Sequence, residues 1–147
     1  MKKRIVKRTS VFPADTKTVF MLLQQFETLQ KIAWPYATFT PIGSVHTWKP
    51  QETCSFAFRL FGLFPMGTHT IHVLRFSMEE GIYTEEGNPF VPVWNHEICL
   101  CPMTEDTCEY TDRVEIQAGW KTGFVTLWAQ CFYRHRQKKW IRLLKKK

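Results

Sequence analysis

Residues 121–145 read KTGFVTLWAQCFYRHRQKKWIRLLK, and this stretch decides the fold that the sequence predicts. Apolar side chains recur along it at helical spacing, which indicates one amphipathic helix. Such a helix is roughly 35 Å long, enough to cross a whole sheet. We expect its buried stripe to consist of Phe124, Leu127, Trp128, Cys131, Phe132 and His135.

Strand-like segments dominate the sequence before this helix. Residues 4–12 predict a first strand, followed by a short helix over 16–25 and a second over 27–32. From residue 37 the apolar residues alternate, and Gly, Pro, Asn and Asp separate the segments. Further strands are expected at 37–43, 53–62, 67–79, 81–88, 91–101 and 107–119.

Segments this short, joined by tight connections, favour an antiparallel meander. A curved sheet closed by a terminal helix buries the apolar faces of both. We therefore predict an α+β helix-grip fold, with a curved antiparallel sheet of about six to seven strands wrapped on the C-terminal helix and two short helices after the first strand.

Composition favours one folded domain over residues 1–147, because 15% of the residues are aromatic and 44% are hydrophobic. No apolar run approaches the roughly 18 to 20 residues that a membrane span needs. The basic start, MKKRIVKRTSVFPAD, is not followed by an apolar segment, so it does not resemble a signal peptide. We expect a cytoplasmic protein whose five cysteines are reduced.

The net charge of +7 comes from the two ends of the chain. Five Lys and Arg residues fall in 1–14 and nine in 121–147, while all 13 acidic residues fall in 15–120. The basic end at 134–147 is either an ordinary solvated helix end that complements the helix dipole or a surface for an anionic membrane. Nucleic acid is not expected as a partner, because the acidic middle of the chain would repel phosphate.

The element order and four stretches resemble the START-like (SRPBCC) superfamily, which includes polyketide cyclases, lipid-transfer domains and birch-pollen-allergen-like proteins. The stretches are LFPMGTHTI (63–71), VWNHEI (93–98), YTDRVEIQAG (110–119) and FYRHRQKKW (132–140), and they look like those of a bacterial cyclase-like subgroup. The resemblance implies a hydrophobic cavity between the sheet and the long helix that holds a lipid, a polyketide or a similar apolar molecule. It does not imply a reaction.

Trp94 and His96 lie two residues apart and so share one face of a strand. A hairpin through 104–106 places Tyr110 and Asp112 on that face. A three-residue loop sets Asp112 opposite Ile98 and diagonal to His96, and a slip of two residues sets Asp112 directly opposite His96. Three interpretations of the His96–Asp112 pair remain open. It is a buried polar pair that satisfies itself, a polar anchor for a ligand, or a catalytic general base of the kind that a cyclase needs.

The remaining candidate residues belong to the predicted ligand pocket, and none of them indicates a metal site or a catalytic nucleophile. His69 and His72 lie on opposite strand faces, and no Cys or His spacing matches a metal motif. We expect no metal and no cofactor. The predicted ligand-binding set is Trp48, His69, Trp94, His96, Tyr110, Asp112 and Trp128.

The predicted function is binding of an apolar small molecule between sheet and helix. The alternatives are a polyketide cyclase- or aromatase-like enzyme that uses His96 and Asp112, and a protein that binds anionic membranes or nucleic acid through its basic ends. The sequence predicts neither the identity of the ligand nor the oligomeric state.

Overall fold

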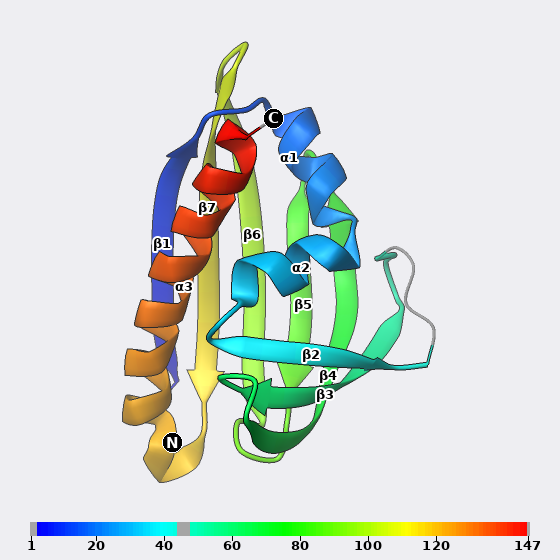
Figure 1. Ribbon diagram of the computed structural model, residues 1–147, viewed down its shortest axis with the longest axis vertical. Coiled ribbons are helices and arrows are strands. Elements are labelled where there is room, and N and C mark those ends of the chain that lie inside the picture. The colour runs from blue at the N-terminus through cyan, green and yellow to red at the C-terminus, as the bar shows by residue number, and fades with distance from the viewer. Residues whose placement is uncertain (1–2, 44–47, 147) are drawn as a thin grey trace.

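The computed structural model describes residues 3–43 and 48–146, and its elements follow the predicted order (Figure 1). They are β1 (Arg4–Phe12), α1 (Thr16–Leu23), α2 (Phe26–Ala33), β2 (Ala37–Ile42), β3 (Thr53–Leu60), β4 (Phe64–Ser77), β5 (Gly81–Gly87), β6 (Val93–Thr104), β7 (Thr107–Gln117), the 3-10 turn η1 (Gly119–Lys121) and α3 (Thr122–Lys145). Asp15 caps α1 by accepting a hydrogen bond from the backbone N–H of Thr18.

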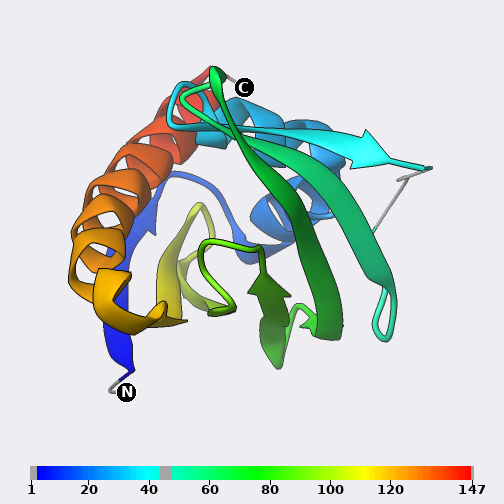
Figure 2. The same cartoon turned by 90° about the horizontal axis from the view of Figure 1, so that it is seen from below.

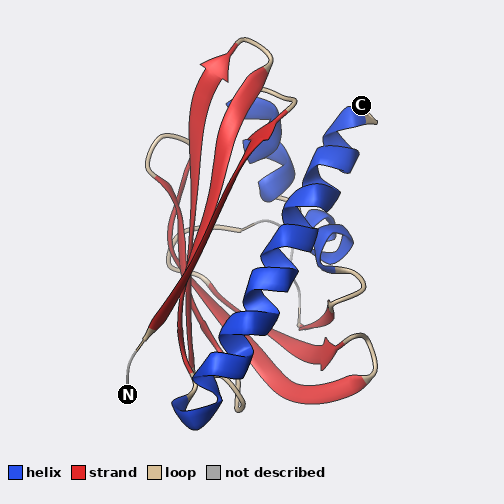
Figure 3. Ribbon diagram, turned by 90° about the vertical axis from the view of Figure 1, so that its left-hand side faces the viewer, coloured by secondary structure: helices blue, strands red, loops and turns tan. Residues whose placement is uncertain are grey.

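The seven described strands form one antiparallel sheet in the order β1-β7-β6-β5-β4-β3-β2. Its pairing register shifts between Ala57 and Arg59 and again between Val73 and Arg75. Such irregularities bend strands and increase their twist. Figure 2 shows the sheet curling around an interior, and Figure 3 shows α3 crossing it obliquely. The predicted helix-grip fold is confirmed.

The largest differences from the predicted strand boundaries are three residues, at the start of β4 and at the end of β6. β4 begins at Phe64 rather than at residue 67, because Phe61 and Gly62 adopt left-handed φ angles of 55° and 71° and turn the chain within residues 61–63. β6 continues to Thr104, which pairs with Thr107 across the hairpin. The first four residues of the predicted connection at 44–52 lie outside the described residues.

The predicted buried stripe of α3 is confirmed at Phe132 and in part at Trp128, which is half-buried and packs against the core, and it is wrong at Phe124 and Leu127. Phe124 and Leu127 are 74% and 61% exposed. The buried residues of the helix are Thr122, Ala129, Phe132, Tyr133, Arg136, Gln137, Trp140 and Leu144. The hydrophobic pattern indicated the wrong face of the helix because the face that is buried includes two polar residues, Arg136 and Gln137. Gln137 is hydrogen-bonded to the sheet.

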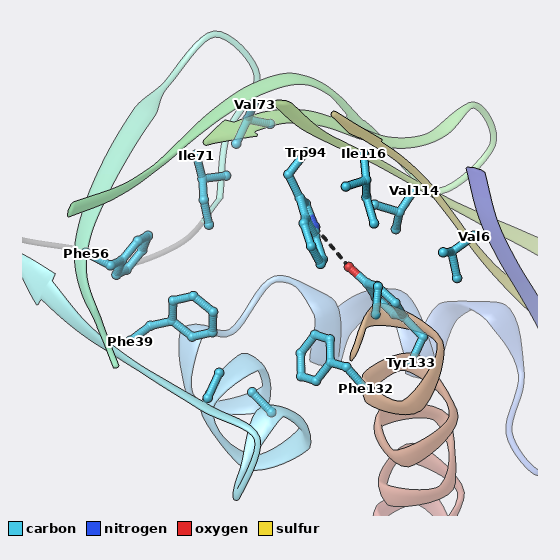
Figure 4. Packing of buried hydrophobic residues seen from close by; sticks show 13 residues of the cluster. Val6, Phe39, Phe56, Ile71, Val73, Trp94, Val114, Ile116, Phe132 and Tyr133 are labelled. Carbon is cyan, nitrogen blue, oxygen red and sulfur yellow. Dashed lines mark hydrogen bonds between the residues drawn. The ribbon is translucent and has the colours of Figure 1, made fainter. Parts of the chain in front are cut away.

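The core consists of two clusters inside the curved sheet. The first surrounds Trp94, Phe132 and Tyr133, and Figure 4 shows Trp94 reaching from the sheet toward Tyr133 on α3. The second surrounds Phe12, whose ring stacks on Tyr110 with centroids 4.5 Å apart. None of the described helices combines the length and the apolar character that crossing a membrane requires.

Candidate functional site

A cavity of about 330 Å³ lies inside the curved sheet, bounded on one side by α3. Its wall is mostly apolar and takes residues from α2, from the sheet and from α3. The strands expose alternate side chains to this interior because their side-chain period is two. The volume falls at the lower end of the range for small-molecule pockets, which is about 300 to 1,000 Å³.

A polar belt, made of His96, Asp112, Arg136 and Gln137, separates the two core clusters. Along each of β6, β7 and α3, the polar residue or residues of the belt lie between a member of the first core cluster and a member of the second. His96 holds that place on β6, Asp112 on β7, and Arg136 with Gln137 on α3. All four are buried, with exposed fractions of 6% or less.

Asp112 is the centre of the hydrogen bonds in the belt. Its register partner is Ile98, as predicted, and the Nε2 atom of His96 lies 2.7 Å from Asp112 Oδ1. The Tyr110 hydroxyl donates to the same oxygen at 3.2 Å, and Gln137 Nε2 donates to Oδ2 at 3.0 Å. Burial alone would raise the pKa of Asp112, but the hydrogen bond from His96 and the positive charge of Arg136 outweigh it and lower the pKa below its ordinary value.

A second carboxylate, that of Glu86 on β5, has an 11% exposed side chain and lies between two imidazoles. Its Oε1 is 2.8 Å from His69 Nε2, and its Oε2 accepts a hydrogen bond from Thr84 at 2.6 Å and lies 3.9 Å from His96 Nδ1. Burial raises the pKa of Glu86, but the hydrogen bond and charge of His69 outweigh it, so the net shift is downward. Asn88 lies 3.1 Å from His69 Nδ1 and so engages the other ring nitrogen.

Gln137 ties the belt to the first strand. Its Nε2 donates to the carbonyl oxygen of Arg8 at 2.8 Å, and its Oε1 accepts from the Ser10 hydroxyl at 2.5 Å. The guanidinium of Arg136 lies 5.5 Å from the centre of the Tyr133 ring. Burial lowers the pKa of Arg136, but Tyr110 and Asp112 outweigh it and raise the pKa above its ordinary value.

Comparison with known proteins identifies the family of the chain. A family model described as "Domain of unknown function (DUF8410)" matches residues 10–144. The chain belongs to the DUF8410 family. A search of the curated proteins found no match.

Solved structures share the fold of this DUF8410 chain at low sequence identity. A START superfamily protein from Mycobacterium smegmatis has a TM-score of 0.76 at 13% identity, covering 97% of both chains. A protein from Arthrobacter aurescens has a TM-score of 0.75 at 13% identity, covering 97% of this chain and 87% of its own. Ara h 8.0201 has a TM-score of 0.64 at 7% identity, covering 96% of this chain and 99% of its own. The START-like fold that the sequence predicted is confirmed.

The DUF8410 cavity brings together most of the residues predicted to bind ligand. Trp48, His69, Trp94, His96 and Trp128 line it. Trp94 also donates from Nε1 to the Tyr133 hydroxyl at 3.1 Å (Figure 4). His72 lies on the opposite face of β4 from His69, as predicted, and its Nδ1 is 2.7 Å from the Thr53 hydroxyl.

Tyr110 and Asp112 do not belong to the cavity wall that the described residues form. Both are fully buried, and Asp112 engages His96. The structure thus brings His96 and Asp112 together but makes His96 the cavity-facing member of the pair. Among the residues at 3–43 and 48–146, no three His, Cys, Asp or Glu side chains are arranged to hold a metal ion.

Sequence reasoning missed Glu86, Tyr133 and Arg136, all of which line the cavity. Alternation along β5 carries a usable signal for Glu86, since Ile82, Thr84 and Glu86 share one strand face. No comparable signal marks Arg136, which stands in a run of cations on a helix whose buried face was predicted incorrectly.

Proposed function

We propose that this DUF8410 protein binds a small hydrophobic molecule, such as a lipid or a polyketide-like compound, in the cavity between the sheet and α3. One observation carries the proposal: a cavity of about 330 Å³ has a mostly apolar wall in which a few polar side chains converge. A largely apolar pocket with a few placed polar groups is the usual form of a small-molecule site. The shared fold with a START superfamily protein supports the same proposal.

Burial of apolar ligand surface provides the driving force, at about 25 cal/mol per Å². His96 gives the ligand its orientation. Its Nε2 is engaged by Asp112, whereas its Nδ1 lies 3.9 Å from the nearest Glu86 oxygen and is the ring nitrogen left for a ligand. Trp94 and Trp128 supply flat apolar surfaces on the same wall.

A cavity-filling substitution tests the proposal. Val91 lines the cavity and is half-buried, so Val91→Trp occupies part of the volume without disturbing the sheet. The matched control is Val11→Trp, which adds the same side chain at a position on β1 that is 52% exposed. The probe is N-phenyl-1-naphthylamine, a neutral apolar dye that fluoresces when it leaves water.

The native protein and Val11→Trp are expected to bind the dye, and Val91→Trp is expected to lose binding while it keeps its melting temperature. Unchanged dye binding by a folded Val91→Trp variant would contradict the proposal.

A second candidate is a cyclase- or aromatase-like reaction, which one observation favours. The His96 imidazole, backed by Asp112 at 2.7 Å, lines the same cavity as the Glu86 carboxylate. A base in this position removes a proton from an acidic C–H, and a second titratable group returns it to oxygen. Turnover of a poly-β-ketone that depends on pH and is lost in His96→Ala supports this candidate. Absence of turnover by the native protein rejects it.

The alternative role at anionic membranes receives less support from the basic end of α3. Arg136 is buried, and so are Trp140 and Leu144, the apolar residues that a membrane-bound helix would insert. We therefore expect the protein not to float with phosphatidylserine vesicles at physiological salt. Salt-sensitive flotation that is lost when Lys145 and Lys146 become glutamine would restore the membrane interpretation.

A further inference from the structure

Arg136 is a buried cation that lines the cavity. Its side chain comes from the middle of α3, and the residue is 6% exposed. No carboxylate among the described residues lies within 4.0 Å of its guanidinium nitrogens, and its Nε has no hydrogen-bond partner there. A buried charge that no carboxylate pairs with directly costs several kcal/mol in proteins, so this guanidinium calls for an anionic acceptor.

The two carboxylates nearby do not supply that acceptor, because both are already engaged by other donors. Asp112 receives His96 and Tyr110 on one oxygen and Gln137 on the other. The Tyr110 hydroxyl donates to Asp112 and its oxygen interacts with the guanidinium, but this oxygen is uncharged and does not neutralise Arg136. Asp112 therefore compensates the Arg136 charge only from a distance.

Glu86 is engaged in the same way. Its Oε1 pairs with His69 and its Oε2 with Thr84. Neither oxygen is within 4.0 Å of a guanidinium nitrogen of the described chain. Lys121 and Arg136 are the cationic residues of the described cavity wall, and Lys121 Nζ already donates to the carbonyl oxygen of Phe90 at 2.8 Å.

Two tryptophans of α3 that line the same cavity carry further donors without a partner in the described part of the chain. The Nε1 atoms of Trp128 and Trp140 are buried without a hydrogen-bond partner in the described part of the chain, and both residues line the cavity. Arg136 and Trp140 are four residues apart and so lie one turn apart on one helix face. The α3 wall of the cavity thus contains three residues with an N–H group that has no partner in the described part of the chain, whereas the carboxylate of the wall, Glu86, lies on the sheet.

From this arrangement we infer that the ligand of the cavity is an amphipathic acid, with an apolar body and a carboxylate or similar anionic group that binds Arg136. The inference rests on the proposed binding function and specifies the chemical class of the ligand. A guanidinium presents its Nε and Nη hydrogens in a planar fork that matches a carboxylate with two parallel hydrogen bonds. Trp140 supplies a further donor on the same helix face.

Linear carboxylic acids and the matching alcohols form a direct test. Octanoate, decanoate and dodecanoate are each compared with the alcohol of the same chain length, and binding is measured by isothermal titration calorimetry and by quenching of tryptophan fluorescence. The acid is expected to bind about tenfold or more tightly than the alcohol, the size of a hydrogen bond to a charged group.

Three variants locate the effect. Arg136→Met removes the fork and keeps the chain length, and it is expected to bring the affinities of acid and alcohol together. Arg134→Met, an exposed position two residues away, is the control for a general loss of positive charge and is expected to change neither affinity. Glu86→Gln removes a negative charge from the cavity wall and is expected to raise the ratio of acid affinity to alcohol affinity several-fold.

The outcomes separate the two proposals. Equal binding of acid and alcohol by the native protein, or an acid preference that survives in Arg136→Met, overturns the inference and leaves the binding function standing. Failure of both compounds at every chain length contradicts the binding function and the inference with it. If Arg136→Met does not fold, the acid–alcohol comparison on the native protein and on Glu86→Gln still decides.

Discussion

The Nε2 atom of His96 lies 2.7 Å from Oδ1 of Asp112, and through this pair the inner face of β6 is joined to β7 in the middle of the core. Gln137 of α3 holds the other carboxylate oxygen, so one buried acid connects two strands to the helix that closes the fold. The same contact keeps the His96 ring in place at the wall of the cavity. Structure and proposed function therefore depend on the same pair.

The lowered pKa values of two carboxyl groups predict a stability that falls in acid. Both Asp112 and Glu86 have folded-state pKa values below their ordinary values of 3.8 and 4.5. Their contribution is fully present above those ordinary values and is lost as the pH falls toward the lowered ones. Urea unfolding at several pH values between about 2.5 and 7 should show the free energy of unfolding decline toward the acid end. A free energy of unfolding that stays constant over this range would contradict the prediction.

Replacing one of these acids isolates its share of the effect. Asp112→Asn is expected to lower the free energy of unfolding at neutral pH by about 3 kcal/mol, because the buried donors of His96 and Gln137 lose their charged acceptor. It should also flatten the acid-side slope. A variant with native stability and a native slope would show that the Asp112 pair does not contribute.

His96→Ala is expected to weaken ligand binding more than it lowers the melting temperature. The reason is that His96 both satisfies Asp112 and lines the cavity, and the ligand loses its polar contact. The measurement compares the dissociation constant for 1-naphthol with the thermal midpoint. His72→Ala on the outer face of β4 serves as the control and should leave binding intact. If His96→Ala loses binding and stability to the same extent, His96 has a structural role only.

The hydrogen bond between Trp94 and Tyr133 should be measurable as a coupling energy. Tyr133→Phe leaves the buried Trp94 Nε1 without its acceptor, 3.1 Å away in the native structure. We expect a loss of about 1 to 3 kcal/mol in unfolding free energy. In Trp94→Phe the same Tyr133→Phe change should cost much less. Equal costs in both backgrounds would mean that the bond contributes nothing.

The buried face of α3 can be checked with two substitutions. Trp140 is fully buried, and Trp140→Ala is expected to cost about 3 to 5 kcal/mol. Leu127 is 61% exposed, and Leu127→Ser should stay within about 0.5 kcal/mol of the native protein. Chemical unfolding measures both. A larger loss at Leu127 than at Trp140 would reverse the assignment of the helix face.

Residues 93–98 and 107–117 show why so much of the sheet could be predicted. A strand places alternate residues on alternate faces, so the period of two and a short hairpin are enough to place Asp112 near His96 in either of the two predicted registers, and the structure has the one with Asp112 opposite Ile98. The element order also predicts the helix-grip arrangement, because a long amphipathic helix that follows an antiparallel meander buries its apolar face by packing against the sheet.

Arg136, Gln137 and Glu86 show why the rest of the site could not be predicted. Charged and amide side chains are usually exposed, and hydropathy therefore assigned Arg136 to a solvated basic end. Their burial depends on hydrogen bonds made across elements distant in sequence, such as Gln137 to Asp112 and His69 to Glu86. The local pattern of apolar and polar residues does not reveal such long-range partners. Phe124 and Leu127 were predicted to be buried but are exposed, because hydropathy does not distinguish an exposed apolar residue from a buried one.

Native mass spectrometry of protein purified from cells tests the central claim most directly. The account predicts a fraction of molecules that carry a mass in excess of the chain, released by organic solvent as a small apolar compound and absent from Val91→Trp. A homogeneous mass equal to that of the chain alone, together with failure of added apolar compounds to bind, would contradict it.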